Sequence, residues 1–198
     1  MTRYYWGKPD TTVNFCEKKY DKLYWIAEYD NTYSALPYIL LGGFLYNTKI
    51  RNIGISIIIL GFSTMLMHGT LRYYGQWCDE CSLFYLSFET IRLFKKNLSF
   101  YYFPPLIICY FYFKDNYLFF LSTFTSLQLL IVYLVIHKKK RYIDKILMFA
   151  YIITFSTATV FWILDQKLCD PKNYVSYHSA WHILSCLGMF YGYLSFII

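Results

Sequence analysis

The feature that most constrains this chain is a series of long apolar stretches separated by short polar breaks. A membrane-spanning helix needs roughly 20 mostly apolar residues. Seven such stretches lie near residues 24–46, 52–71, 77–94, 98–113, 117–136, 143–165 and 176–197. Apolar residues make up 57% of the 198-residue chain, which is more than a soluble domain usually carries. The sequence therefore predicts an all-α membrane protein, a single domain built as a bundle of seven transmembrane helices.

The charged residues lie mostly in the segments before and between these apolar stretches. Residues 1–22 form a polar segment with no apolar run before it, so we expect no cleavable signal peptide. The net charge of +7 could indicate a nucleic-acid partner. The basic residues, however, lie mostly between the apolar stretches, and we therefore expect a membrane protein that binds no nucleic acid.

The loops predict an orientation. The loops near Lys49 and Arg51, near Lys95 and Lys96, and at 138–141 share one side of a seven-span bundle. Basic loops face the cytosol, so we expect a cytosolic C-terminus and a lumenal or extracellular N-terminus, in a membrane of the endoplasmic reticulum or Golgi type. The basic residues of the N-terminal segment favour the opposite orientation less strongly.

Ionisable residues gather at one end of the predicted bundle. His68 ends the second stretch, and His178 and His182 begin the seventh. Residues four apart share one face of a helix, and three imidazoles plus water are a common catalytic zinc site. The alternative is that these histidines only line the membrane interface. An ionisable residue costs at least ~2.5 kcal/mol at the centre of a span, which favours a functional role.

Two further residues fit hydrolysis at such a site. Asp79, at the start of the third stretch, could accept a proton from zinc-activated water and deliver it to a leaving amine. Glu80 points about 100° away on the same helix and is the poorer candidate. Thr64 lies one helical turn before His68, where its hydroxyl could support an oxyanion. It could equally bond back to its own helix.

Four segments in order resemble the alkaline ceramidase family, a group of seven-span amidases within a superfamily that includes adiponectin-type receptors. They are "NFCEKKYDKLYWIAEYDNTYSAL", "HGTLRYYGQWCDE", "WILDQKLC" and "HSAWHIL". The resemblance covers nearly the whole chain. It implies that His68, His178 and His182 are zinc ligands and that Asp79 is the acid that transfers the proton. Thr64 falls where the family has an oxyanion-supporting serine.

The resemblance also implies a calcium site in the N-terminal segment. Glu17 and Glu28 match two of its ligands, and Phe15 matches a ligand that acts through its backbone carbonyl. Asn14 and Lys19 depart from the family pattern. We expect the Lys19 ammonium to occupy or crowd the calcium position and to pair with Glu17 and Glu28. The alternative is that Lys19 points to solvent and water fills its place.

A disulfide between Cys16 and Cys169 is also expected. Both residues lie on the predicted lumenal side, an oxidising lumen permits the bond, and the resemblance supports this pairing. Two free interfacial thiols are the alternative.

The leading interpretation is a hydrolase that cleaves the amide bond of ceramide to a sphingoid base and a fatty acid, with zinc-bound water as the nucleophile. Its partners would be the lipid substrate and the membrane, with no obligatory protein partner. A receptor-like protein with a structural zinc, or a degenerate enzyme altered at Asn14, Lys19 and Thr64, is the alternative. Retention of Asp79 favours the enzyme, since a structural zinc needs no base.

Overall fold

The computed structural model describes residues 4–138, 141–170 and 175–198, and all regular structure within them is helical. The predicted basic loop and the loop after residue 165 therefore lie partly outside the described residues. The elements are α1 (Tyr29–Tyr33), α2 (Leu36–Tyr46), α3 (Arg51–Thr70), α4 (Tyr73–Phe94), the 3₁₀ turn η1 (Phe100–Tyr102), α5 (Phe103–Tyr112), α6 (Tyr117–Lys138), α7 (Tyr142–Lys167) and α8 (Tyr177–Ile197).

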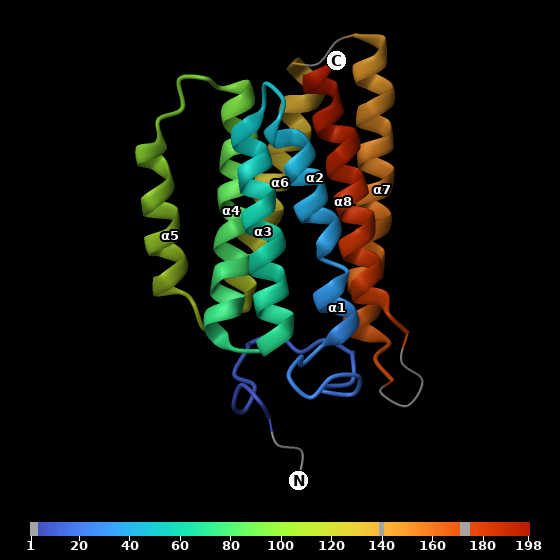
Figure 1. Cartoon of the computed structure of the whole chain (residues 1–198). Coiled ribbons are helices and arrows are strands. Elements are labelled where there is room, and N and C mark those ends of the chain that lie inside the picture. The colour runs from blue at the N-terminus through green and yellow to red at the C-terminus, as the bar shows by residue number, and fades with distance from the viewer. Residues whose placement is uncertain (1–3, 139–140, 171–174) are drawn as a thin grey trace.

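The long helices stand side by side in one bundle, and the N-terminal segment lies across the end opposite the C-terminus (Figure 1). Four of them, α3, α6, α7 and α8, are long and apolar enough to cross a membrane. Large apolar side chains also cover the outside of the bundle: Leu118 is 71% exposed and Phe149 is 66% exposed. Exposed large apolar side chains in such number are typical of a surface that contacts lipid. An all-helical membrane protein is confirmed, while the number of crossings stays a prediction.

The first predicted span, 24–46, is not one helix. It is a short α1 and an 11-residue α2, separated at Ser34 and Ala35, with extended backbone at Glu28 before them. Pro37 lies in the first turn of α2. Because proline has no N–H and its ring clashes with the carbonyl four residues earlier, it kinks or breaks a helix, and here the helix is broken before it.

The fourth predicted span, 98–113, is also shorter than expected. Only ten residues of it form α5, about 15 Å of helix, which is less than the ~30 Å hydrocarbon core. Pro104 and Pro105 lie in its first turn, where the missing N–H groups are tolerated. The segment before them is a 3₁₀ turn, and α5 stands apart at one edge of the bundle (Figure 1).

Close packing of α2 against α3 depends on glycine. A methyl group on Gly54 would come within 2.4 Å of the backbone nitrogen of Tyr46, and one on Gly42 within 2.7 Å of the carbonyl oxygen of Gly54. Small residues let helix backbones approach closely in membranes, where no hydrophobic effect drives association. This contact holds α3, which carries His68, close against α2.

The N-terminal segment is attached to the helix ends by hydrogen bonds. Gln76 of α4 accepts a bond from the backbone N–H of Thr12 at 2.8 Å and donates to its hydroxyl at 2.6 Å. The backbone N–H groups of Ala27 and Glu28 donate to the carbonyls of Gly69 and His68 at 2.9 and 3.0 Å. The segment thereby closes the histidine end of the bundle.

Candidate metal centre and lipid cavity

Three histidines from two helices meet at this end of the bundle. His68 ends α3, and His178 and His182 lie one turn apart at the start of α8. All three side chains are buried, and one potential ligand nitrogen from each lies within 4.8 Å of the others. The structure thus brings together the three residues that the sequence nominated as zinc ligands.

Hydrogen bonds orient two of the rings. His68 Nδ1 lies 2.6 Å from Glu28 Oε2, and His182 Nδ1 lies 2.8 Å from Ser34 Oγ. A histidine that ligates a metal commonly uses its other nitrogen in this way, which fixes the tautomer and the ring. These contacts leave the Nε2 atoms of His68 and His182 available as metal ligands.

The third ring supports the same arrangement. His178 Nε2 lies 3.2 Å from His68 Nε2, and the Phe15 ring packs on His178 with centroids 4.0 Å apart. Within the described residues His178 Nδ1 is buried without a partner. The nitrogen that faces the other two rings is Nε2, so each of the three histidines can offer one nitrogen to a common metal ion. The donor set, three imidazoles, suits zinc.

Asp79 and Thr64 contact each other beside the histidines. Thr64 Oγ1 lies 2.5 Å from Asp79 Oδ1 and 2.9 Å from the Leu60 carbonyl of its own helix. A hydroxyl carries one hydrogen, so Thr64 donates to one acceptor at a time. The observed contact orients the Asp79 carboxylate, and an oxyanion role for Thr64 stays a prediction.

The neighbouring carboxylate is engaged elsewhere. Glu80 receives hydrogen bonds from Gln76 Nε2 at 2.7 Å and from the Tyr110 hydroxyl at 2.6 Å. Both of its oxygens are therefore occupied within α4 and α5. Asp79 Oδ2, by contrast, has no partner in the described part of the chain.

A cavity of about 470 Å³ opens beside these groups. The three histidines, Asp79 and Thr64 form its polar end, and the rest is mostly apolar side chains of α6, α7 and α8. A separate, smaller cavity of about 50 Å³ has Leu83, Phe124 and Gln128 in common with it as lining residues and lies along α4 as far as Phe94. From Asp79 to Phe94 is about 22 Å of helix. The site is a group of polar side chains in a mostly apolar cavity.

The lysine of the N-terminal segment points into the protein. Lys19 Nζ donates to the Phe15 carbonyl at 2.5 Å and to Glu28 Oε1. Glu28, fully buried, thus bridges Lys19 through one oxygen and His68 through the other. Asn14 is exposed, and its backbone carbonyl accepts a bond from Gln166 at 3.4 Å.

The expected pairing of Glu17 with Lys19 is wrong. The Glu17 oxygens accept the backbone N–H groups of Asp30 and Asn31 at 2.7 and 2.8 Å, rather than pairing with Lys19. The first N–H groups of a helix lack intrahelical partners, and a buried carboxylate is a suitable acceptor for them. Burial raises the pKa of Glu17, and the two backbone hydrogen bonds oppose that rise.

A disulfide joins Cys16 and Cys169, with Cα atoms 5.2 Å apart, as expected. It ties the N-terminal segment to the end of α7. Asp165 reinforces the attachment, because its Oδ2 accepts the Cys16 backbone N–H at 3.2 Å. Phe15, which packs on His178, is held between these two bonds and Lys19.

Several residues of the site were not nominated from the sequence. Ser34 orients His182, and Tyr110 and Gln76 hold Glu80. Asn31 donates to Glu28 at 3.2 Å and accepts from Ser179 at 2.9 Å. No local pattern marks these contacts, since Ser34 and His182 are 148 residues apart in sequence. The burial of polar residues next to histidines is the only signal, and it requires the fold.

Fold and site together define a helical membrane protein with a buried three-histidine centre that can hold a metal ion. The family model for Ceramidase matches residues 7–198, and the chain belongs to that family. Mouse alkaline ceramidase 1 is 24% identical over 91% of the chain and 77% of its own length. Mouse alkaline ceramidase 3 is 25% identical over 94% and 82%. A putative alkaline ceramidase of Dictyostelium discoideum is 25% identical over 98% and 88%. The resemblance to the alkaline ceramidases is confirmed.

Proposed function

We propose that this protein hydrolyses the amide bond of ceramide to a sphingoid base and a fatty acid, with a zinc ion held by His68, His178 and His182. The observation that carries the proposal is the shared cavity: three buried imidazoles and the carboxylate of Asp79 line one mostly apolar cavity. Membership in the Ceramidase family supports both the reaction and the substrate.

A zinc ion at the histidines would supply a Lewis acid for the amide carbonyl and lower the pKa of a water molecule to about 7. Asp79 is the proton carrier. Its free Oδ2 takes a proton from the attacking water as the new C–O bond forms. It returns the proton to the amide nitrogen as the C–N bond breaks, which releases a neutral amine. Thr64 donates a hydrogen bond to Asp79 Oδ1 and so orients Asp79 Oδ2.

The remaining lining suits a lipid substrate. The cavity beside Asp79 is lined mostly by apolar side chains of α6, α7 and α8, and a second, small cavity lies farther along α4. An aliphatic chain placed there removes apolar surface from water at about 25 cal/mol per Å². Glu28 fixes the His68 ring, so that the imidazole keeps its Nε2 directed at the centre.

The test is incubation of the purified protein with ceramide and detection of the released sphingoid base by mass spectrometry. Asp79→Asn should retain the metal but lose amide hydrolysis by about 10²–10⁴-fold, since the amide cannot accept the proton. Asp115→Asn removes an exposed acid outside the site and should leave turnover unchanged. Turnover of Asp79→Asn within a few-fold of wild type would remove Asp79 from the mechanism.

We infer further that Lys19 takes the place of a calcium ion. Calcium needs six to eight oxygen ligands. Here the Lys19 ammonium already uses the Phe15 carbonyl and one oxygen of Glu28, while Glu17 is engaged by backbone N–H groups. The positive charge of Lys19 compensates the buried Glu28 in the manner that a cation would.

For the whole chain we propose seven crossings, with the histidine end facing the lumen of the endoplasmic reticulum or Golgi. The support is the set of basic residues at the opposite end and the Cys16–Cys169 bond, which needs an oxidising compartment. An N-glycosylation acceptor added before the first residue should then be glycosylated in cells, and one added after the last should not. The reverse pattern would overturn the orientation.

A further inference from the structure

A second cavity lies at the other end of the bundle from the histidines. It measures about 300 Å³ and is formed by the loop between α2 and α3, the first turn of α3 and the last turn of α4. From Arg51 to His68 along α3 is about 26 Å, close to the ~30 Å thickness of the hydrocarbon core. When the histidine site lies near one membrane surface, this cavity lies at the level of the head groups of the other.

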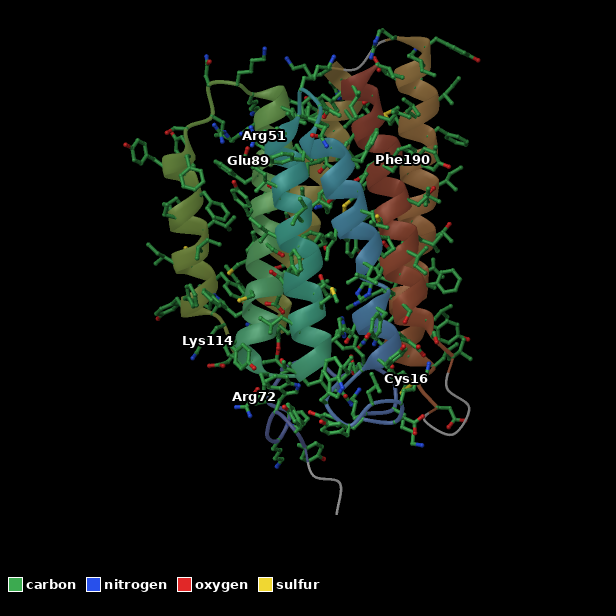
Figure 2. All side chains as sticks on the ribbon, in the orientation of Figure 1. Cys16, Arg51, Arg72, Glu89, Lys114 and Phe190 are labelled. Atoms are coloured by element: carbon green, nitrogen blue, oxygen red, sulfur yellow. A yellow bond between two sulfur atoms is a disulfide. The ribbon has the colours of Figure 1, made fainter. Side chains whose placement is uncertain are left out.

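Basic residues dominate its lining. Among the described residues that line it are four cations, Lys49, Arg51, Arg92 and Lys96, and one carboxylate, that of Glu89. Glu89 is 4% exposed and accepts a hydrogen bond from Arg92 Nη1 at 2.6 Å. Because Arg92 neutralises Glu89, the remaining three charges leave the cavity strongly positive. Figure 2 shows Arg51 and Glu89 close together at this end of the bundle.

Several donors here have no acceptor. Arg92 Nε is buried without a partner within the described residues. The backbone N–H groups of Arg51 and Asn52 open α3, and Ile50 before them offers no side-chain cap; in the described part of the chain neither N–H finds an acceptor. Arg51 is held in place by the Tyr46 side chain, with its guanidinium carbon 4.1 Å from the ring centroid. A helix start with unsatisfied N–H groups and nearby cations attracts anions.

We propose that this cavity binds a phosphate group. A carboxylate carries one charge and needs one guanidinium, whereas three uncompensated cations, free N–H donors and 300 Å³ suit the larger, more highly charged phosphate. Basic pockets between membrane helices accept the head groups of anionic lipids, and a soluble phosphate would present the same oxygens. The two sources share one chemistry and differ in whether acyl chains accompany it.

Substitution of the two exposed lysines at the cavity is the most specific test of the proposed phosphate site. Lys49 and Lys96 line the cavity, and neither makes an ion pair in the described part of the chain. Their joint substitution, Lys49→Gln with Lys96→Gln, should therefore leave the fold intact. Lys138→Gln with Lys145→Gln is the matched control, because it removes two exposed charges from the same end of the bundle outside the cavity.

The experiment follows the thermal unfolding midpoint of the detergent-solubilised full chain during titration with three probes: phosphatidic acid, the diacylglycerol of the same chains, and inorganic phosphate. We expect phosphatidic acid to raise the midpoint of wild type and of the control variant. Its apparent dissociation constant should rise about 25-fold in the Lys49/Lys96 variant, at roughly fivefold per basic residue.

The results with the three probes distinguish a lipid head group from free phosphate as the ligand. Protection by phosphatidic acid but not by inorganic phosphate assigns the site to a lipid head group, and protection by both assigns it to free phosphate as well. Equal loss of protection in the two double variants would show general surface electrostatics and overturn the site. Equal protection by diacylglycerol would show that phosphate is not recognised.

Discussion

At the scale of single residues, Glu28 connects the N-terminal segment to the proposed zinc centre. One oxygen meets the Lys19 ammonium and the other meets His68 Nδ1, with all of Glu28 shielded from solvent. A buried carboxylate without such partners would cost several kcal/mol. The ammonium therefore contributes to the orientation of a histidine that it does not touch.

Lys19→Asn tests whether the ammonium replaces calcium. Asparagine supplies an oxygen and removes the charge, so calcium should gain the carboxylate of Glu28 and the Phe15 carbonyl as ligands. Titration calorimetry should show little calcium binding in wild type and a clear gain in the variant. Lys18→Asn, at an exposed residue paired with Asp21, should behave as wild type. Tight binding to wild type, unchanged in Lys19→Asn, would show that the lysine is a bystander.

At the scale of elements, the positions of the helices could be predicted and their interruptions could not. Apolar length located α3, α4, α6, α7 and α8 to within a few residues. The break before α2 follows from Pro37, and the shortness of α5 from Pro104 and Pro105. These prolines were visible in the sequence, but a proline in an apolar stretch is compatible with either a kink or a break until neighbouring helices decide.

Part of the candidate site could likewise be predicted from the sequence, and part could not. Helical spacing paired His178 with His182, and the scarcity of histidine outside the basic loop added His68. Contacts such as Ser34 with His182, or Glu17 with the start of α1, depend on how elements distant in sequence pack. No periodicity encodes them, so they could be found only in the folded chain.

The disulfide determines how firmly the N-terminal segment stays on the bundle. Cys169→Ser should lower the thermal unfolding midpoint, because a bond between residues 153 positions apart typically contributes about 2–5 kcal/mol. Cys109→Ser, at an exposed free thiol of α5, is the control and should change little. Coincident unfolding midpoints for the two variants would show that the hydrogen bonds of the segment suffice without the disulfide.

At the scale of the whole molecule, the two ends of the bundle are chemically different. The histidine end is closed by the N-terminal segment and leads into the mostly apolar cavity. The opposite end carries the cation-lined cavity and the basic loops. In the proposed reaction the amide of the lipid would lie at the histidines and its chains in the apolar part of the same cavity, with the cation-lined cavity at the opposite membrane surface.

The measurement that tests the central claim most directly is ceramide turnover by the purified protein after its metal is stripped with a chelator and after zinc is restored. We expect release of sphingoid base to fall to background on stripping and to return with zinc. His182→Ala should fail to recover because it removes a proposed zinc ligand, whereas His137→Ala, at an exposed histidine of α6, should recover fully. Turnover that survives complete removal of the metal, or equal recovery of both variants, would contradict a metal-dependent amidase at these histidines.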